Sequence, residues 1–504
     1  MKFKNIKKIA ILSTGLFLMA SCSEEFLTPK TNGTILESDY YSSEVEAFSG
    51  LTAVYDVLGW ENLLGRIVGL NSASDDFYAG GGGSGDISEI QRWDNYTLNS
   101  TNSPSAEYWK KGYSGVFRAN KLLTKLPDVP MNDDVKARFT AETKALRAYF
   151  YFDLVRFFKN IPLITVPVVQ ADYYTIPQAT PEAVYAQIEA DLIAAIPDLP
   201  MTVNGATEGG RLTQGAAKAL LGKVYLFQNK YTDAAAQFAE VNGTPGATSQ
   251  YGYKLLDSFA DLWNITNRFN SESILEIVHT NKGNWGDWGN VAGSEGNILN
   301  QMIGPRDYVA RTADAPDYVS GYGFNPLSVD LYNAYSASDL RRSATVADLT
   351  KLVTDGKATY GAGYNDTGYF LEKFVGRLSD RPAGAGSPEL NWPQDTYEIR
   401  LADTYLMEAE AIVKGGGNTA RAQALLDAVR TRAGLTSIPA TDENIFNERR
   451  LELAGEGQRW FDLIRTGRAA SVLSPFGFVA GKHEILPIPQ NELSNTILKQ
   501  NPNY

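Results

Sequence analysis

The chain of 504 residues contains a single cysteine, Cys22, and only two histidines, His279 and His483. One cysteine excludes internal disulfide bonds and every zinc site built from several cysteines. The histidines lie far apart in the sequence, and isolated histidines of this kind are more often packed or surface residues than metal ligands. We therefore expect no cofactor and no metal site. The many carboxylates leave a Ca²⁺ site as an alternative.

Positive charge is also scarce. Lysine and arginine number 46 against 58 aspartates and glutamates, which gives a formal net charge of −12. No Lys/Arg stripe compensates for this acidity, so the composition disfavours nucleic acid as a partner. Apolar residues make up 43% of the chain and charged residues 21%, as in ordinary globular proteins. The chain can therefore bury a large core.

No apolar segment reaches the about 20 residues that a membrane-spanning helix requires. Residues 9–20 (IAILSTGLFLMA) follow four lysines and have the size of a secretion-signal core. Cys22 comes directly after the small residues Ala20 and Ser21, an arrangement that resembles a bacterial lipobox. We predict a signal peptide over residues 1–21 and a lipid-modified Cys22. The alternative is a soluble secreted protein with a free cysteine.

Helical periodicity dominates several long stretches. In residues 141–158 apolar side chains recur at spacings of three and four: Leu146, Tyr149, Phe150, Leu154 and Phe157. This spacing places them on one face of a helix. Another helix is predicted to begin after Thr180, a good N-cap residue, with Pro181 at its first position.

A short motif predicts a helical hairpin further along the chain. Leu221-Gly222 is followed at fixed offsets by Tyr225, Ala234 and Phe238, as in the tetratricopeptide pattern. Gly222 and Ala234 would allow two antiparallel helices to approach closely, while the aromatic rings fill the space between them. Lys218 stands where that pattern usually has Trp.

Residues 397–464 form a second helical block. Two periodic segments flank three glycines at 415–417, which predicts another hairpin. In the following segment, residues 447–467, charges alternate at helical spacings: Arg449, Glu452, Glu456, Arg459 and Asp462. Paired carboxylates can act as a general acid and base, but each has an arginine one turn away. We interpret this segment as a salt-bridged helix.

Between the blocks, residues 246–394 are rich in Gly, Asn, Asp, Tyr and Trp and show no lasting helical period. Only residues 272–280 (ESILEIVHT) alternate like a short strand. A long irregular region inside a helical protein is usually functional or disordered. The many aromatic residues argue against disorder.

Taken in order, several stretches resemble the SusD/RagB family of outer-membrane lipoproteins. They are the lipobox, FLTPKTNG, ASDDFYAGGG, AETKALRAYFYFDLVRFFKNIPLI, ALLGKVYLF, YEIRLADTYLMEAEA, NERRLELAGEGQRWFDLIRTG and LPIPQNELSN. The resemblance covers nearly the whole mature chain. It departs at the end, where QNPNY lacks the family's usual glycine near the last tyrosine.

The resemblance implies a mostly α fold: a tetratricopeptide-like helical scaffold, the SusD-like α-α superhelix, with a large irregular loop-rich insertion. Its regions would be a tether (22–45), an N-terminal helical region (46–245), a ligand-facing loop region (246–394) and a C-terminal helical region (395–504). Such proteins are not enzymes. They capture oligosaccharides, less often peptides, at the cell surface and cover a SusC-like TonB-dependent transporter. SEEF after the cysteine resembles a surface-export signal, so the expected location is the outer membrane, facing the exterior.

Sugar rings stack on aromatic side chains, and their hydroxyls bind carboxylates, amides and guanidinium groups. Residues 279–290 (HTNKGNWGDWGN) supply both kinds of group in a polar, glycine-rich run. The ligand candidates there are Asn284, Trp285, Asp287 and Trp288. Alternatively, the two indoles fix a loop onto the helices.

A second candidate run is residues 71–86 (NSASDDFYAGGGGSGD). The ligand candidates in and after it are Asp75, Asp76, Tyr78 and Trp93, with Asp94 nearby. Turn formation is the alternative role for these residues. Weaker candidates are Arg306, Tyr308 and Tyr322. Trp109, Trp263 and Trp460 lie in periodic apolar segments and are predicted to be core.

The leading hypothesis is a surface glycan-binding lipoprotein that feeds a transporter. A glycoside hydrolase acting on the same polysaccharide is the second, since 58 acidic residues contain many carboxylate pairs but no motif selects one. A scaffold whose tetratricopeptide groove binds peptides is the third.

Overall fold

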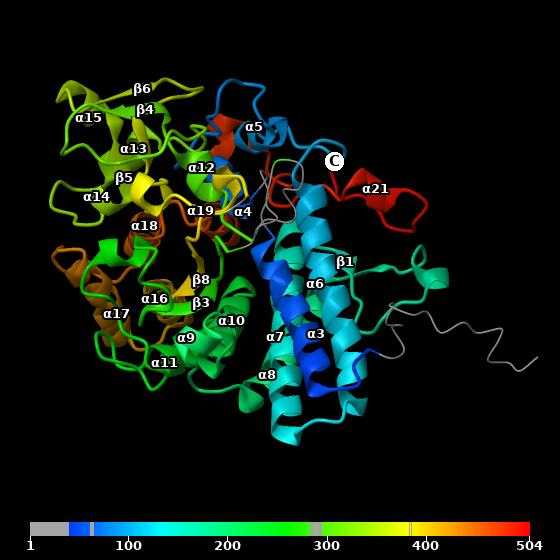
Figure 1. Ribbon diagram of the computed structural model, residues 1–504. Helices are drawn as coiled ribbons and strands as arrows, with labels where there is room; N and C mark the ends of the chain where they lie inside the picture. The colour runs from blue at the N-terminus through cyan, green and yellow to red at the C-terminus, as the bar shows by residue number, and fades with distance from the viewer. Residues whose placement is uncertain (1–39, 61–64, 283–287, 289–294, 383, 385) are drawn as a thin grey trace, which may run out of the picture.

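The computed structural model describes residues 40–60, 65–282, 288, 295–382, 384 and 386–504 (Figure 1). Its N-terminal half is built on long helices that pack side by side, α3 on α6, α6 on α7 and α7 on α8. These helices are α3 (Glu44–Asp56), α6 (Ser105–Lys125), α7 (Asp133–Phe158) and α8 (Pro181–Ala195). The shorter α4 (Arg66–Ser72) and α5 (Ser88–Asp94) lie between α3 and α6 in the sequence.

The ends of the long helices follow ordinary capping rules. The Asn132 side chain accepts hydrogen bonds from the first turn of α7, and Thr180 caps α8 with Pro181 as its first residue. The predicted apolar face of residues 141–158 is confirmed, because Leu146, Phe150 and Leu154 are each 1% exposed.

The predicted tetratricopeptide-like hairpin is formed by α10 (Gln214–Phe227) and α11 (Tyr231–Asn242). A Cβ atom on Gly222 would lie 2.8 Å from the Phe238 ring, so glycine is what permits this approach. Ala234 and Phe238 are fully buried at the contact. The short α9 (Gly205–Glu208) precedes this hairpin.

The second predicted hairpin consists of α16 (Leu401–Gly415) and α17 (Thr419–Arg432). Gly416 ends α16 in the left-handed conformation, with φ +72°, which suits glycine. The start of this block differs from the prediction, because residues 397–400 belong to strand β8 (Thr396–Arg400) and not to the helix. β8 pairs antiparallel with β3 (Ser273–Ile277), the strand predicted in residues 272–280.

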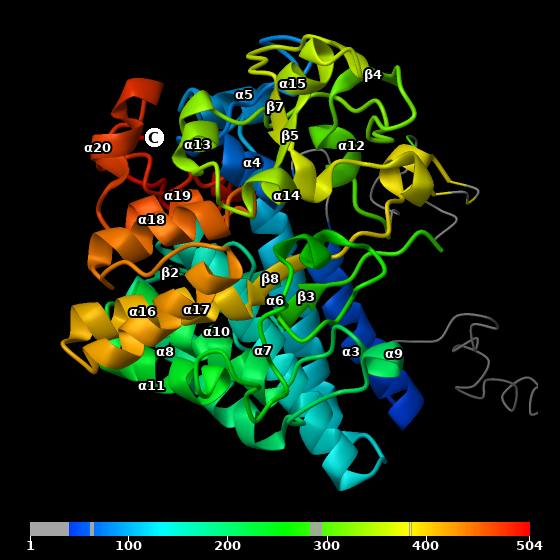
Figure 2. The ribbon, with the colours of Figure 1, turned by 90° about the vertical axis from the view of Figure 1, so that its left-hand side faces the viewer.

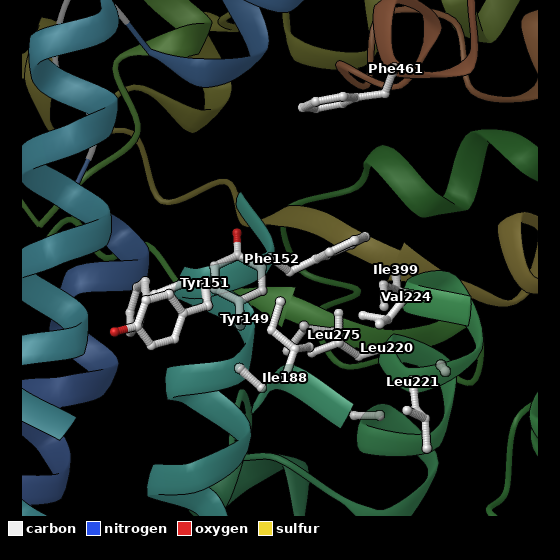
Figure 3. Packing of buried hydrophobic residues seen from close by; sticks show 14 of the residues in the cluster. Tyr149, Tyr151, Phe152, Ile188, Leu220, Leu221, Val224, Leu275, Ile399 and Phe461 are labelled. Carbon is white, nitrogen blue, oxygen red and sulfur yellow. The ribbon is translucent and has the colours of Figure 1, made fainter. Parts of the chain in front are cut away.

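The largest apolar cluster joins the two helical halves. Figure 3 shows Phe152 of α7, Ile188 of α8 and Val224 of α10 turned toward Leu275 and Ile399 of the β3–β8 pair. Each of these side chains is at most 4% exposed. Helices from both halves therefore share one core, which gives the loop region a firm base.

The prediction of one salt-bridged helix over residues 447–467 is wrong in two respects. The segment forms two helices, α18 (Asp442–Glu452) and α19 (Arg459–Arg465). Between them Gly455 and Gly457 have φ of +80° and +70°, a conformation that turns the chain. Asp462 does pair within the segment, with Arg449 and Arg465. Glu452 instead binds other elements: its carboxylate accepts a hydrogen bond from Nη1 of Arg400 at 2.6 Å and pairs with Arg341 and Arg432.

Short elements make up the region between β3 and β8, and in both views they gather at the end of the molecule opposite α8 and α11 (Figures 1 and 2). The short helices are α12 (Leu299–Ile303), α13 (Val329–Ala334), α14 (Arg342–Thr345) and α15 (Leu349–Thr354). Antiparallel pairs join β4 (Arg306–Ala310) to β6 (Ala358–Gly361) and β5 (Val346–Asp348) to β7 (Tyr369–Leu371).

The remaining elements are the small pair β1 (Ile161–Pro162) with β2 (Gln178–Ala179), and the C-terminal helices α20 (Ala469–Leu473) and α21 (Gln490–Leu493). Within the described ranges no helix combines the length and the apolar character that crossing a membrane demands. The architecture is thus mostly α, with a loop-rich region carried by helical hairpins, as expected.

Candidate functional site

Trp288 is the one predicted ligand residue of its segment that the structure describes. Asn284, Trp285 and Asp287 lie outside the described residues. The Trp288 side chain is 47% exposed, and its ring centroid lies 6.3 Å from that of Tyr322, tilted by 42°. Two aromatic rings therefore meet at the surface of the loop region.

Arg306, at the start of β4, holds the backbone of Tyr322 in place. Its Nη1 donates a hydrogen bond to the Tyr322 carbonyl oxygen at 2.9 Å. The Tyr322 backbone N–H in turn donates to the carbonyl of Gln301 in α12 at 2.8 Å. A Cβ on Gly323, where φ is +74°, would lie 2.9 Å from Cγ of Arg306, so the arginine stem packs closely beneath this turn.

The glycine run after Tyr78 joins the same surface. Gly80 and Gly81 have φ of +71° and +87°, and a Cβ on Gly80 would lie 2.4 Å from the carbonyl oxygen of Gly323. The Gly81 N–H donates to that carbonyl at 2.8 Å, and the Gly81 carbonyl accepts from the N–H of Tyr364 at 2.8 Å. The run therefore permits close approach of three loops and leaves the Tyr364 side chain 38% exposed.

We call the surface formed by Trp288, Tyr322, Arg306, Tyr364 and Gly80–Gly82 the loop-face site. The site contains one cation, Arg306, and its acidic neighbours are Asp86 and Glu389. Burial, followed by the charge of Glu389, raises the pKa of the Tyr322 hydroxyl, which therefore stays a neutral donor at physiological pH. Asp86 accepts a hydrogen bond from the Gly82 N–H at 2.7 Å. Exposed rings beside donors and acceptors can hold a polyhydroxylated ligand.

Asp75 and Asp76 are not available to a ligand, which corrects their prediction. Both oxygens of Asp75 accept hydrogen bonds from Arg459 at 2.8 Å, and Asp76 accepts from Arg450 at 2.7 Å. Burial would raise the pKa of Asp75, but Arg459 outweighs it and the pKa is lowered. Burial, and then the charge of Asp75, raises the pKa of Asp76 to about 6. These carboxylates fix the loop to α18 and α19.

Trp93 must also be withdrawn as a ligand-stacking residue. It is fully buried in α5, with its ring 5.3 Å from that of Trp460, so neither face is open to a sugar. Tyr308 is 7% exposed, and its hydroxyl donates to the Pro316 carbonyl at 2.7 Å. Residues of other elements pack against the rings of Trp93 and Tyr308, and a local sequence pattern does not reveal such contacts.

The two other candidates of this run, Asp94 and Tyr78, are partly exposed. Burial raises the pKa of Asp94 to about 6, although a hydrogen bond from the Ala79 backbone opposes the shift. The Tyr78 N–H donates to the Pro326 carbonyl at 3.1 Å, which ties the start of the glycine run to the turn that carries Tyr322. Tyr78 remains a candidate at the edge of the site.

Sequence patterns do not single out Tyr364 and Glu389. Tyr364 lies in a stretch rich in Gly, Asn and Asp, the same signal that selected Trp288. Glu389 lies in a short turn far along the chain, and only folding places its charge near Tyr322. Trp109 and Trp460 are core residues as predicted, whereas Trp263 is only partly buried.

Both histidines are packed inside, His279 at 1% and His483 at 3% exposed. Burial lowers the pKa of each to about 4, so both are neutral at physiological pH. In the part of the chain that the structure describes, no three His, Cys, Asp or Glu residues form a group that could hold a metal ion.

Two family models match different parts of the sequence. The one described as "SusD family" matches residues 332–504, and the one described as "Starch-binding associating with outer membrane" matches residues 69–226. Among curated proteins, "SusD-like protein P25" of Formosa agariphila is 25% identical and covers 96% of this chain and 97% of its own. A "SusD-like protein" of Bacteroides ovatus is also 25% identical, over 91% of this chain and 82% of its own.

Solved structures agree with this assignment. A "Laminarin binding SusD-like protein" is 54% identical, covers 92% of this chain and all of its own, and superposes with a TM-score of 0.89. "Surface glycan-binding protein A from Bacteroides thetaiotaomicron in complex with laminarihexaose" is 30% identical, covers 91% of this chain and 99% of its own, and gives a TM-score of 0.82. The chain thus shares sequence, fold and nearly its full length with SusD-like proteins, and it therefore belongs to the SusD family.

Proposed function

We propose that this protein binds a glycan at the cell surface through the loop-face site and delivers it to a TonB-dependent outer-membrane transporter. The observation that carries the proposal is the exposed Trp288 ring beside Tyr322, on loops held by Arg306 and the glycine run. A pyranose ring would place its apolar face on these rings. Its hydroxyls would meet the Tyr322 hydroxyl, Glu389 and the exposed parts of the loop backbone.

The glycan that we propose is laminarin or one of its oligosaccharides. The support is the 54% identity to a laminarin-binding SusD-like protein and the 30% identity to a surface glycan-binding protein solved with laminarihexaose. Relatives at these identities and TM-scores of 0.89 and 0.82 share the same backbone framework, which makes a related ligand the most economical expectation. Peptides remain the alternative ligand class.

We further propose that Cys22 carries the lipid that holds the protein at the outer membrane, facing the exterior. The segment concerned, residues 1–39, lies outside the described residues, so the proposal rests on the apolar run, the lysines before it and the position of the cysteine. Two or more acyl chains would give a stable anchor. The predicted tether, residues 22–45, would then end just before the folded body, since Glu44 and Val45 already belong to α3.

Incubation with laminarihexaose separates binding from hydrolysis. The protein is titrated with laminarihexaose by calorimetry, and the same mixture is analysed by chromatography after prolonged incubation. We expect a saturable binding isotherm and an unchanged hexasaccharide. Appearance of shorter sugars would favour the hydrolase alternative, in which two carboxylates about 5–10 Å apart act on the bond. Binding of peptides but not of laminarihexaose would favour the peptide scaffold.

A further inference from the structure

A groove of about 450 Å³ lies beside α6, between that helix, the loop that joins β1 to β2 and the chain in and after α21. Figure 1 shows the β1–β2 loop and α21 on the same side of α6. We call it the α6 groove. The aromatic and aliphatic side chains that line it include Trp109, Tyr113, Phe117, Tyr173 and Leu498.

Apolar side chains at the edge of the α6 groove are open to solvent. Phe117 is 52% exposed and Tyr173 is 53% exposed. Two further exposed residues lie next to the lining residues: Ile497 is 53% exposed, and its N–H donates to the carbonyl of Tyr174, which is 56% exposed. Apolar side chains that gather around one groove mark an interaction surface, whereas scattered ones do not. The groove therefore suits an occupant that brings apolar side chains of its own.

The helix beside the groove is basic, although the protein is acidic. α6 contains four lysines and one arginine against one glutamate, while the whole chain has a formal net charge of −12. Lys110 and Arg118 line the groove, together with one acid, Glu492. Arg118 also pairs with Asp56 at 2.6 Å. Complementary charge favours an occupant that carries more acids than bases.

The segment directly before the described chain has both properties. Residues 23–39 (SEEFLTPKTNGTILESD) contain four acids and one lysine. They also contain two apolar pairs, Phe26-Leu27 and Ile35-Leu36. The same chain thus supplies a segment whose apolar and charged side chains both match the α6 groove.

The described chain also begins beside α6. A Cβ on Gly50 of α3 would lie 2.6 Å from the Tyr41 ring and 3.1 Å from Leu122 of α6, so the ring and the leucine are neighbours. Phe117 precedes Leu122 by five residues, a distance of about 7.5 Å along a helix. Leu36 precedes Tyr41 by five residues, and an extended segment of that length spans about 17 Å. Leu36 can therefore reach the groove.

We propose that residues 23–39 bind in the α6 groove of their own chain. Ile35 and Leu36 pack against the rings of Phe117 and Tyr113, and the acids of the segment lie beside the cations of α6. Because the segment is covalently attached, its effective concentration at the groove is of millimolar order, and weak contacts keep it bound. The docking depends neither on the glycan nor on the lipid. With a lipid on Cys22, it would turn the α6 side of the body toward the membrane.

Lys30 makes the position of this segment measurable, because it is the only lysine or arginine in residues 23–39. A docked segment is cleaved by trypsin only after release, so the cleavage rate at Lys30 follows the released fraction. The rate is measured by mass spectrometry on the full chain carrying Cys22→Ser, to which no lipid is attached. Leu36→Ser, Phe117→Asp and their combination are compared with Val329→Asp. Val329 is the matched control, since it is 50% exposed but belongs to α13.

We expect Leu36→Ser and Phe117→Asp each to raise the cleavage rate about tenfold. Their combination should add little, because both substitutions remove the same contact. Val329→Asp should leave the rate unchanged. Equal rates in Phe117→Asp and in the protein without it overturn the proposal. So do multiplying effects of the two substitutions, which would place Leu36 and Phe117 in separate contacts.

Two additions to the experiment identify other occupants. Cleavage that slows with rising protein concentration, together with dimers in sedimentation, would assign the α6 groove to a second copy. Protection that appears only with phosphatidylcholine–phosphatidylglycerol vesicles would assign it to a lipid surface. Either result overturns docking within one chain. A cooperative urea transition shows that Phe117→Asp is folded. If it is not, Leu36→Ser decides, because that residue lies outside the described body. Binding of laminarihexaose bears only on the proposed function.

Discussion

Trp288 and Trp93 carry the same side chain, but Trp288 is 47% exposed and Trp93 is fully buried. Tyr322 and Tyr308 differ in the same way, since Tyr322 meets Trp288 while Tyr308 packs against Tyr318 at 5.1 Å. A sugar can stack only on a ring with an open face. Exposure of individual rings, and not aromatic content, therefore defines the loop-face site.

Gly222 supports a residue-scale prediction about stability. A methyl group there would lie 2.8 Å from the Phe238 ring, which is fully buried against α16 and cannot move aside cheaply. We expect Gly222→Ala to lower the free energy of unfolding by about 1–3 kcal/mol, measured by urea denaturation. Gly85→Ala is the control: nothing lies within 4 Å of its Cβ position, so a change within about 0.5 kcal/mol is expected. Equal effects of both substitutions would contradict the close-packing account.

The glycine-rich run predicts exposed indoles, and Trp288 is 47% exposed, but the run does not indicate which residues surround that ring. A glycine-rich polar run offers an indole few local apolar partners, and exposure follows from that. Trp93 lies after a similar run, yet Trp460, more than 300 positions later, covers it. Asp75 pairs with Arg459 and Asp76 pairs with Arg450, and these partners are also more than 300 positions apart in the sequence. Such long-range partners are set by the fold, and local patterns do not contain them.

At the scale of elements, a buried ionic network joins α17, α18 and the β3–β8 pair. Glu452 lies at its centre, fully buried, and pairs with Arg400, Arg341 and Arg432. Burial opposes its charged form, but Arg432, Arg400 and Arg341 outweigh burial and lower the pKa of Glu452. The network replaces the simple salt-bridged helix that the charge spacing predicted.

Glu452→Gln should be strongly destabilising. It leaves several buried guanidinium groups with too little negative charge, and breaking such a network costs about 3–5 kcal/mol. Asp355→Asn is the matched control, because Asp355 pairs with Lys351 on the surface at 2.7 Å. We expect the control to cost less than about 1 kcal/mol in urea denaturation. A similar small cost for Glu452→Gln would show that the network does not hold these elements together.

Strand β3 carries a carboxyl group with an unusual titration. Burial, followed by the charge of Asp395, raises the pKa of Glu276 from 4.5 to about 8. Between these values the folded protein holds a proton that the unfolded chain has released. The contribution of Glu276 to the free energy of unfolding therefore falls as the pH rises from about 4.5 to about 8.

Glu276→Gln should remove this contribution. Relative to the wild type, the variant is expected to become progressively more stable between pH 5 and pH 8, because glutamine has no proton to lose. Urea denaturation at several pH values measures the difference. Asp257→Asn, at a side chain that is 97% exposed, should show no such trend. A constant difference between Glu276→Gln and wild type across this range would contradict the raised pKa.

The hairpins were predictable because small residues mark their contacts. Gly222 and Ala234 allow the close contact of α10 and α11, and Gly416 adopts the left-handed conformation that ends α16. The break between α18 and α19 was missed, although Gly455 and Gly457 stand at it. Strong charge periodicity concealed a turn that only their positive φ values reveal. Helical period is thus a better guide to where helices are than to where they end.

For the whole molecule, a base of packed helices lies opposite a loop-rich end (Figures 1 and 2). The loop-face site, with Trp288 and Tyr322, belongs to that end. The helices share one core, so the loops rest on a rigid support. A binding protein benefits from such preorganisation, because less order has to be created when the ligand arrives. The proposed anchor would hold this body at the membrane.

Lipidation is tested by metabolic labelling with radioactive palmitate in a bacterial host that processes lipoproteins. We expect label on the wild type and none on Cys22→Ser, because Cys22 is the only thiol in the chain. The variant should also move from the membrane fraction to the soluble fraction. Label that persists on Cys22→Ser, or a wild type that takes up none, would contradict the anchor.

The central claim is that exposed rings of the loop face hold the glycan. Affinity for laminarihexaose is measured by calorimetry for the wild type, Trp288→Ala and Phe117→Ala. Phe117 is a matched control, since it is 52% exposed but belongs to α6 in the helical base. We predict that Trp288→Ala weakens binding by roughly 30-fold, the effect of losing about 2 kcal/mol from an aromatic anchor, while Phe117→Ala leaves it unchanged. Unaltered affinity in Trp288→Ala would contradict the account.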